Sequence, residues 1–430
     1  MYNSWYSLIS AFATLSLTSG GFAVAMKEYA SDRDKYQSSV LSLTSIIALI
    51  IVTIFLFAPS FWSEILGLPR ILIVLMLFGF LFAPARDFWL ARQRYEYKYK
   101  LAGIVTIGSA LIASILSVVA VLYSNEYGTI DAADARLIAN YAVVYGVAAI
   151  IWISTLVKGK TFFNIEYWKM SLALSIPLVG YSIAAQILSV SDRMMISQMV
   201  GNSAVGVYGT LYTVSSLSLM IWQAIHSSFV PFLFQNIEKK EQNIKNVSFV
   251  LMLLYALVAV MLTYMAPEIV RVLATEEYME AIYIMPPIAA GVFFTAYANI
   301  YSDIAVYFKK TKYVMYPAIV AAAANVVLNY IFIKMFGYMA AAYTTLIAYI
   351  LLAYLQAVWA NKVCKENGIG KEKIFSDQKM LVMAIVTVVL CLLGIALYHF
   401  TVLRYIVVLG VIVFSLFLAK KYNIKQMMMK

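Results

Sequence analysis

Ionisable side chains inside long apolar runs are the residues whose chemistry stands out. An arginine lies beside a carboxylate twice, at Arg86–Asp87 and at Asp192–Arg193, and a further carboxylate, Asp303, lies near the end of another apolar run. A guanidinium group can hold an anionic ligand through two parallel hydrogen bonds. Carboxylates inside membrane segments often mark proton or sodium paths. These residues are therefore candidates for substrate or ion contacts.

Each of these residues also has a simpler structural explanation. Arg86 is close enough to the end of its run to extend to the membrane interface. Asp192 and Arg193 can form an ion pair or end a helix, and Asp303 can cap the basic loop from Lys309. The sequence alone leaves both explanations open.

One histidine and several amides add polar groups to the apolar runs. His226, one of two histidines, shares its run with Gln223 and Ser227 and can titrate near neutral pH. Hydroxyl-bearing ligands could be bound by the amides of Asn299, Asn325, Asn329, Gln186 and Gln223. Membrane amides equally often bond the backbone or each other, and such a histidine often bonds only a neighbour.

The composition requires that these residues be carried by membrane-spanning helices. Hydrophobic residues make up 63% of the 430 residues, charged residues make up 12%, and the mean hydropathy is +0.84, which a water-soluble fold cannot accommodate. The apolar runs are continuous, which favours helices over barrel strands. About thirteen spans are predicted, near 4–26, 40–62, 70–91, 101–123, 137–157, 170–195, 207–232, 247–266, 281–305, 314–334, 338–360, 380–399 and 403–419.

The basic residues indicate an orientation. The net charge is +11, but the charges fall between apolar runs and do not form the basic face of a nucleic-acid-binding module. Alternate loops hold all but six of the 32 basic residues, the exceptions being Arg70, Arg136, Arg193, Arg271, Lys334 and Arg404. The positive-inside rule places the basic loops and the C-terminus in the cytoplasm. Thirteen spans then put Met1 outside, so we expect an upstream helix to be missing.

An internal repeat agrees with that expectation. The segment from Tyr2 to Tyr6 matches the segment from Tyr208 to Tyr212, and the pair Ala58–Pro59 matches Ala266–Pro267 in the same order. The later segment is preceded by a helix that has no counterpart before Tyr2. We therefore expect an all-α membrane protein with an N-terminal lobe over 1–160, a C-terminal lobe over 161–362, and a cytoplasmic loop, terminal helix pair and basic tail over 363–430.

The segment SDRMMISQMVGNSAVGVYGTLYTV carries a family resemblance through Asp192, Arg193, Gly201, Gly206 and Tyr208, supported by the segment around Asn325, Asn329 and Gly337. It resembles the polysaccharide-exporter branch of the MOP superfamily, the O-antigen flippases of the Wzx type. The resemblance implies transport of an undecaprenyl-pyrophosphate-linked oligosaccharide from the cytoplasmic to the periplasmic leaflet of a bacterial inner membrane. Alternating access between the lobes would be coupled to an ion gradient or the membrane potential.

Roles follow for the candidate residues. The resemblance makes Arg86 a candidate for the pyrophosphate, and Arg193, Asn299, Asn325, Asn329 and Gln223 candidates for the rest of the substrate. Ion coupling or gating is assigned to Asp87, Asp192, Asp303 and His226. The expected partners are the lipid-linked oligosaccharide, membrane lipids and other polysaccharide assembly proteins, and no cofactor, metal or catalytic residue is expected.

Other functions remain open. A multidrug or cation antiporter of the same superfamily would use a cavity carboxylate, and the basic interior candidates argue mildly against it. A membrane enzyme acting on lipid-linked glycans would need a long outer loop, whereas the expected outer loops are short. No phosphate-binding glycine loop or zinc motif stands out. A scaffold without transport activity is a further alternative.

Overall fold

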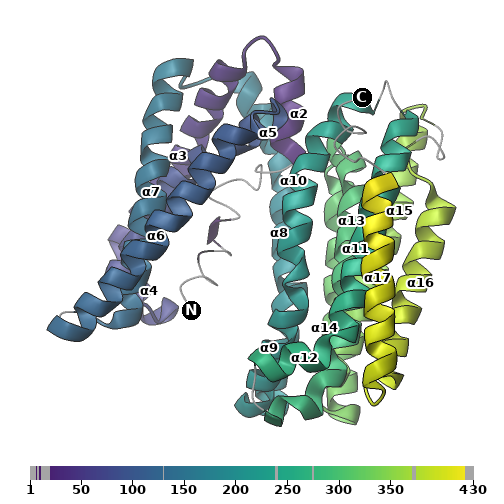
Figure 1. Ribbon diagram of the computed structural model, residues 1–430. Coiled ribbons are helices and arrows are strands. Elements are labelled where there is room, and N and C mark those ends of the chain that lie inside the picture. Colours follow the sequence, from purple (N-terminus) through teal and green to yellow (C-terminus); the bar gives the residue numbers. More distant parts are fainter. Residues whose placement is uncertain are drawn as a thin grey trace. The chain divides into compact units, whose positions relative to one another are not determined.

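The computed structural model describes residues 6, 9–10, 20–128, 130–237, 241–273, 276–369 and 374–421 (Figure 1). Every regular element in these ranges is a helix. The chain divides into two compact units, Met1–Ile183 and Ala184–Lys430. The predicted boundary after residue 160 falls between two helices, and the three-part division of the chain remains a prediction.

In the first unit, α7 is the central helix, and three other long helices pack against it. A proline at the first position starts α4, directly after Ala58, and a left-handed Gly67 ends it. The helices are α2 (Gly20–Glu28), α3 (Arg33–Phe57), α4 (Pro59–Leu66), α5 (Arg70–Tyr95), α6 (Tyr99–Tyr127), α7 (Ala132–Gly159) and the first part of α8 (Ile165–Met199).

Close packing joins α3 to α7 and α8. A side chain at Gly159 would meet the backbone oxygen of Asp34 at 2.2 Å, so only glycine allows this approach. The fully buried Tyr36 shares a hydrogen bond of 2.9 Å with Ser171 of α8. The first unit therefore holds its helices together partly through polar contacts that need no water.

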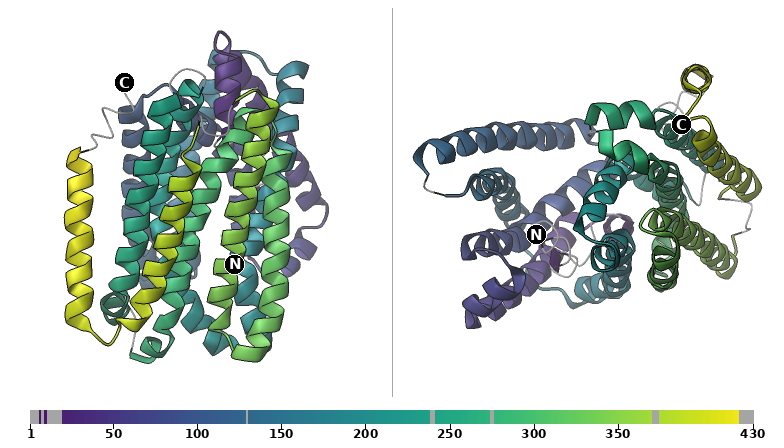
Figure 2. Two further views of the ribbon diagram at one scale, coloured as in Figure 1. Left: turned by 90° about the vertical axis from the view of Figure 1, so that its right-hand side faces the viewer. Right: turned by 90° about the horizontal axis from the view of Figure 1, so that it is seen from below.

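The second unit is built around α13, which is almost wholly buried. Its helices are the rest of α8, α9 (Asn202–Ser216), α10 (Ser218–Asn236), α11 (Glu241–Tyr264), α12 (Ala266–Leu273), the 3-10 helix η1 (Glu276–Ile284), α13 (Met285–Tyr307), α14 (Lys312–Phe336), α15 (Ala340–Glu366), α16 (Asp377–Ala396) and α17 (Thr401–Lys421). Figure 2 shows α16 and α17 on the outside of this unit, and both pack against α11.

The order of helices repeats between the two units. In each, a long helix is followed by a short one that begins at the Ala-Pro pair, and then by three long helices: α3 to α7 in the first unit, and α11, α12, α13, α14 and α15 in the second. The 3-10 helix η1 is an addition in the second unit. The repeat predicted from the matching segments is thus visible in the element order.

Twelve helices of the described ranges are long and apolar enough to cross a membrane. They fall on the predicted spans from 40–62 onward, which confirms the all-α membrane fold. The expected span at 4–26 lies largely outside the described residues. The sequence analysis did not predict α4, α12 or η1, because elements of eight or nine residues are too short to show as apolar runs.

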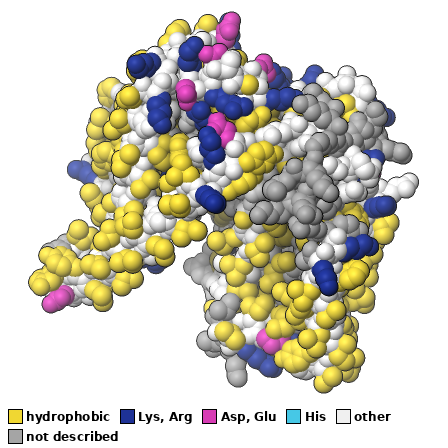
Figure 3. Space-filling model, turned by 45° about the horizontal axis from the view of Figure 1, so that its top comes forward, with side chains coloured by type: hydrophobic (Ala, Val, Ile, Leu, Met, Phe, Trp, Pro, Cys, Tyr) yellow, Lys and Arg dark blue, Asp and Glu magenta, His cyan; other side chains and the backbone are white. Residues whose placement is uncertain are grey.

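The outer faces of the long helices are apolar, as contact with lipid requires. On α6, for example, Ile104, Ile107, Leu111 and Ile115 are each more than half exposed. Figure 3 shows Lys and Arg side chains gathered at the end of the first unit where α3 begins and α5 ends, with hydrophobic side chains along the helix flanks. This separation of charged ends and apolar flanks fits a protein held in a bilayer.

Candidate functional site

A cationic site on α5 contains the first predicted substrate residue. Arg86 and Asp87 are both half-buried. The buried Nε of Arg86 has no hydrogen-bond partner among the described residues. Asp87 lies within electrostatic range of both Arg86 and Arg94. Since two guanidinium groups act on one carboxylate, this part of α5 carries an excess of positive charge inside a membrane helix.

Neighbouring charges at the end of α5 have a different role. Arg92 forms an ion pair with Asp34 and donates to Glu96 at 2.9 Å, and Arg33 lies 3.5 Å from the same glutamate. Burial acts to raise the pKa of Glu96, but hydrogen bonds from Lys98 and Arg92 hold it below its usual value. These ion pairs fasten the start of α3 to the end of α5, so their charges are already neutralised, unlike that of Arg86.

Asp192 and Arg193 sit on α8, in the second unit. Asp192 is fully buried and accepts hydrogen bonds from the Tyr208 hydroxyl and from the backbone N–H of Arg193, each at 2.7 Å. The guanidinium group of Arg193 stacks over the ring of Tyr212 at 4.5 Å, and its buried Nε has no hydrogen-bond partner in the described part of the chain. Asp192 therefore joins α8 to α9, and Arg193 keeps a free donor.

Asn325 and Asn329 are placed in a buried polar network. Both are fully buried, and the Asn329 amide donates to the Asn325 carbonyl at 3.1 Å. Ser191 donates to that same carbonyl at 2.8 Å, and the Asn325 amide donates to Thr345 at 3.3 Å. The network joins α8, α14 and α15. Substrate contact by these two residues remains a prediction. Their full burial among protein partners does not support it.

The remaining candidates lie on α10 and α13. The His226 Nε2 and the Asp303 Oδ2 are 2.8 Å apart, so the structure brings together two residues that are distant in the sequence. Gln223 is exposed on α10. Asn299 is half-buried on α13, and its backbone carbonyl accepts a hydrogen bond from Ser302 at 2.8 Å. Gln223 and Asn299 stay predictions as substrate contacts.

The sequence analysis missed a clamp between α12 and α17. Arg404, which is 2% exposed, donates to both carboxylate oxygens of Glu268 at 2.7 and 2.8 Å and to the Tyr264 carbonyl at 2.8 Å. Burial acts to raise the pKa of Glu268, but hydrogen bonds led by those from Arg404 hold it below its usual value. A signal was available, because Arg404 is one of the six basic residues outside the basic loops and therefore needs a local acidic partner.

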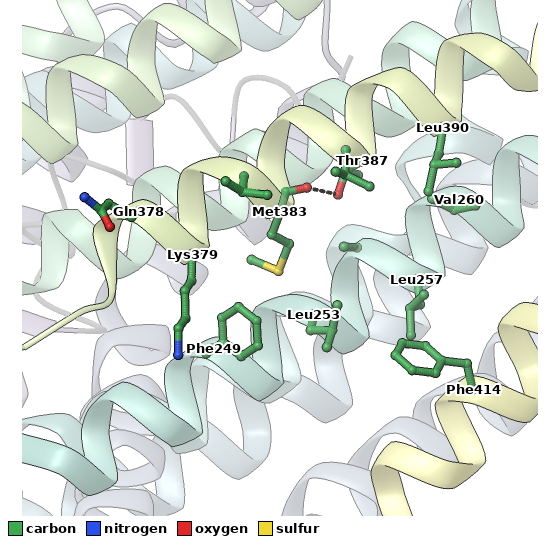
Figure 4. A pocket seen from close by; sticks show the side chains of 13 residues that line it. Phe249, Leu253, Leu257, Val260, Gln378, Lys379, Met383, Thr387, Leu390 and Phe414 are labelled. Carbon is green, nitrogen blue, oxygen red and sulfur yellow. Dashed lines mark hydrogen bonds between the residues drawn. The ribbon is translucent and has the colours of Figure 1, made fainter.

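A groove of about 710 Å³ lies between α11, α16 and α17 (Figure 4). Its lining is almost entirely apolar, and Gln378 and Lys379 stand at one end. Leu253, Leu257 and Phe414 are typical of the rest of the lining. Such a surface matches hydrocarbon chains of membrane lipids and offers few groups to a sugar, so we do not place the glycan there.

The part of the chain that the structure describes shows no clear site for metal binding or for a reactive thiol. Those residues contain no cluster of three or more His, Cys, Asp or Glu side chains suited to a metal ion. Cys364 and Cys391 are both buried and free. The chemistry available to the described site residues is therefore hydrogen bonding, charge and proton exchange.

The twelve long apolar helices of the described ranges and the polar groups within them define a multi-pass α-helical membrane protein. The family model for polysaccharide biosynthesis proteins matches residues 1–237, and the MatE family model matches residues 177–331. The chain belongs to the polysaccharide biosynthesis protein family. Comparison with curated protein sequences gives no match.

Solved structures share the fold at low sequence identity. An outward-facing multidrug resistance MATE family transporter of the MOP superfamily is 14% identical, with a TM-score of 0.66 over 85% of this chain and 86% of that one. A mutant of the Vibrio cholerae MATE transporter VcmN is 14% identical, with a TM-score of 0.63 over 85% and 86%. A MOP superfamily transporter from Pyrococcus furiosus, whose title notes a binding pocket of reversed polarity, is 12% identical, with a TM-score of 0.64 over 83% and 85%.

Proposed function

We propose that this chain is a flippase that moves an undecaprenyl-pyrophosphate-linked oligosaccharide from the cytoplasmic to the periplasmic leaflet of a bacterial inner membrane. The cargo joins an anionic pyrophosphate and a polar glycan to an apolar lipid. Neither polar part crosses about 30 Å of hydrocarbon without help. The family match and the twelve apolar helices support transport of a lipid-linked glycan rather than its synthesis.

The observation that carries this proposal is the Nε of the Arg86 guanidinium group. This atom is buried without a hydrogen-bond partner in the described residues, although the arginine lies within a membrane helix. A buried donor left without a partner is unfavourable, and an anionic ligand would satisfy it. Arg94, on the same helix, would add a second positive charge beside the diphosphate.

The test is restoration of surface polysaccharide in a bacterial strain that lacks its own flippase. We expect restoration by the unchanged chain and a loss of about tenfold or more with Arg86→Ala, because one charge-assisted hydrogen bond contributes about 1.5–3 kcal/mol. Arg86→Lys should restore only part of the activity, since lysine cannot make the bidentate contact. The matched control is Arg70→Ala, which removes the exposed arginine at the other end of α5.

Membrane abundance of each variant has to equal that of the unchanged chain for the comparison to hold. Equal restoration by Arg86→Ala would exclude Arg86 from pyrophosphate binding. Absence of restoration by the unchanged chain, despite normal membrane insertion, would contradict glycolipid export itself.

A second candidate function is antiport of amphipathic cations. The MatE match over residues 177–331 and the shared fold of MATE transporters favour it. A cationic drug would need an accessible carboxylate, whereas the buried unpaired groups on α5 and α8 include the Nε atoms of Arg86 and Arg193. Efflux of a cationic dye from cells that show no polysaccharide restoration would favour this function over the first.

A further inference from the structure

An acid–base pair bridges two membrane helices of the second unit. His226 of α10 and Asp303 of α13 meet at 2.8 Å between Nε2 and Oδ2. Both lie within candidate membrane spans. Their side chains are 17% and 6% exposed, so the carboxylate is shielded and the imidazole keeps some access to its surroundings. The carboxylate of the pair is thus buried, and the imidazole remains partly accessible.

The surroundings of the pair are aromatic. The ring of Trp222 stacks on that of His226 with centroids 5.5 Å apart, and Tyr255 of α11 packs on Trp222 at 5.2 Å. Trp222 is 1% exposed. In such a setting an isolated charge is unfavourable, and two opposite charges in contact stabilise each other.

Several titratable groups on the helices packed against α10 and α13 have partners other than this pair. Tyr212 of α9 shares a hydrogen bond with Tyr349 of α15 at 3.2 Å, and Tyr255 donates to Ser218 at 3.4 Å. Asp377 of α16 accepts from Tyr301 at 2.8 Å. Within the described residues, no hydrogen bond or ion pair joins His226 or Asp303 to a third group.

Three carboxylates well inside the candidate membrane spans, Asp87, Asp192 and Asp303, differ in what faces them. Asp192 faces a tyrosine hydroxyl and a backbone N–H, and Asp87 faces two arginines, none of which releases a proton near neutral pH. Asp303 faces an imidazole, the side chain whose ordinary titration falls in the physiological range. Only the third arrangement couples a buried acid to a base that can exchange protons.

We infer that the His226–Asp303 pair is a proton-binding site that couples transport to the proton gradient. With the imidazole neutral, the pair carries the single negative charge of the Asp303 carboxylate. A proton taken up by the imidazole gives an imidazolium–carboxylate ion pair with no net charge. The attraction between α10 and α13 strengthens in that state, and release of the proton weakens it. This inference rests on the proposed flippase function for its cargo.

The first experiment needs no cargo. Imidazolium quenches indole fluorescence on contact, so the emission of Trp222 reports the charge on His226. We expect the purified chain to show a fluorescence transition between about pH 5 and pH 9 that is absent in His226→Gln and in Trp222→Phe. His399→Gln, the matched control at the exposed second histidine, should keep it. An unchanged transition in His226→Gln would overturn the proton site.

The second experiment uses phospholipid vesicles containing a fluorescent undecaprenyl-pyrophosphate disaccharide, with a membrane-impermeant quencher reporting its leaflet. A pH gradient should accelerate movement by the unchanged chain and by His399→Gln about fivefold or more. His226→Gln and Asp303→Asn should keep the gradient-free rate within about twofold and lose the acceleration. The double variant His226→Asp with Asp303→His, which exchanges the two side chains, should recover part of the acceleration. Its recovery would show that these substitutions allow the chain to fold.

The two experiments distinguish failure of the proton site from failure of the proposed flippase function. Acceleration that persists in Asp303→Asn would overturn coupling at this pair. A normal fluorescence transition in a chain that moves no disaccharide would overturn the proposed flippase function and leave the proton site standing.

Discussion

Asp192 and Asp303 are both buried carboxylates in membrane helices of the second unit, but their contacts differ. Asp192 is held by a phenol and a backbone N–H, in a setting that continues into the Asn325–Asn329 network through the neighbouring Ser191. Among the described residues, Asp303 has a single hydrogen-bond partner, His226, which can change its charge. Polar groups in membrane helices thus serve two purposes, and the partners rather than the burial distinguish them.

The difference can be stated as closed and open contacts. A closed contact joins groups that do not titrate near neutral pH, so its loss should reduce stability. An open contact contains a titratable partner, so its loss should change coupling more than stability. The clamp between Glu268 and Arg404 is the strongest closed contact, because it is bidentate and Arg404 is nearly inaccessible.

The largest expected effect is the loss of that clamp. Glu268→Ala leaves the guanidinium group of Arg404 buried without its counter-ion, which should lower the free energy of unfolding by about 3 kcal/mol. Thermal unfolding of the purified chain in detergent measures this. Glu64→Ala, on the corresponding short helix α4 and exposed, is the matched control and should have little effect. A change in gradient acceleration without a loss of stability would make the clamp an open contact.

Acid should weaken the same clamp in the unchanged chain. The pKa of folded Glu268 lies below its usual value of 4.5, so the clamp's contribution is complete above that pH and is lost as the pH falls through the lowered pKa. The melting temperature should therefore decrease when the pH is lowered below about 4.5. Glu268→Ala should show a smaller fall, and an equal fall in both chains would assign the acid sensitivity to other groups.

A smaller effect is expected in the asparagine network. Asn325→Leu removes the acceptor of Ser191 and Asn329 and the donor to Thr345, and should reduce stability by about 2 kcal/mol, since three groups lose a partner. Asn202→Leu, at an exposed amide bonded to Ser197, is the control. Should Asn325→Leu abolish glycolipid movement at full stability, Asn325 would be a substrate contact after all.

The smallest effect is expected at Asp192. Tyr208→Phe removes one hydrogen bond to the carboxylate and leaves the backbone N–H, so the loss should be about 1 kcal/mol. The acceleration by a pH gradient should be unchanged, in contrast to Asp303→Asn. Loss of that acceleration in Tyr208→Phe would remove the distinction between the two carboxylates.

Apolar runs were enough to predict the twelve described spans, because a bilayer requires long continuous hydrophobic helices. Asn325 and Asn329 are four residues apart, so the sequence places them on one helix face, but only the fold shows that α15 covers that face. His226 and Asp303 were each selected as ionisable membrane residues. Their pairing depends on how α10 packs on α13, which no sequence pattern specifies.

Movement of a lipid-linked glycan by the purified chain is the most direct test of the central claim. Vesicles containing the undecaprenyl-pyrophosphate disaccharide should show transfer between leaflets with the unchanged chain and with Arg70→Ala. Arg86→Ala should reduce that transfer by about tenfold or more. If the unchanged chain transfers no more disaccharide than protein-free vesicles do, while it expels a cationic dye, the chain is an antiporter and the flippase account is wrong.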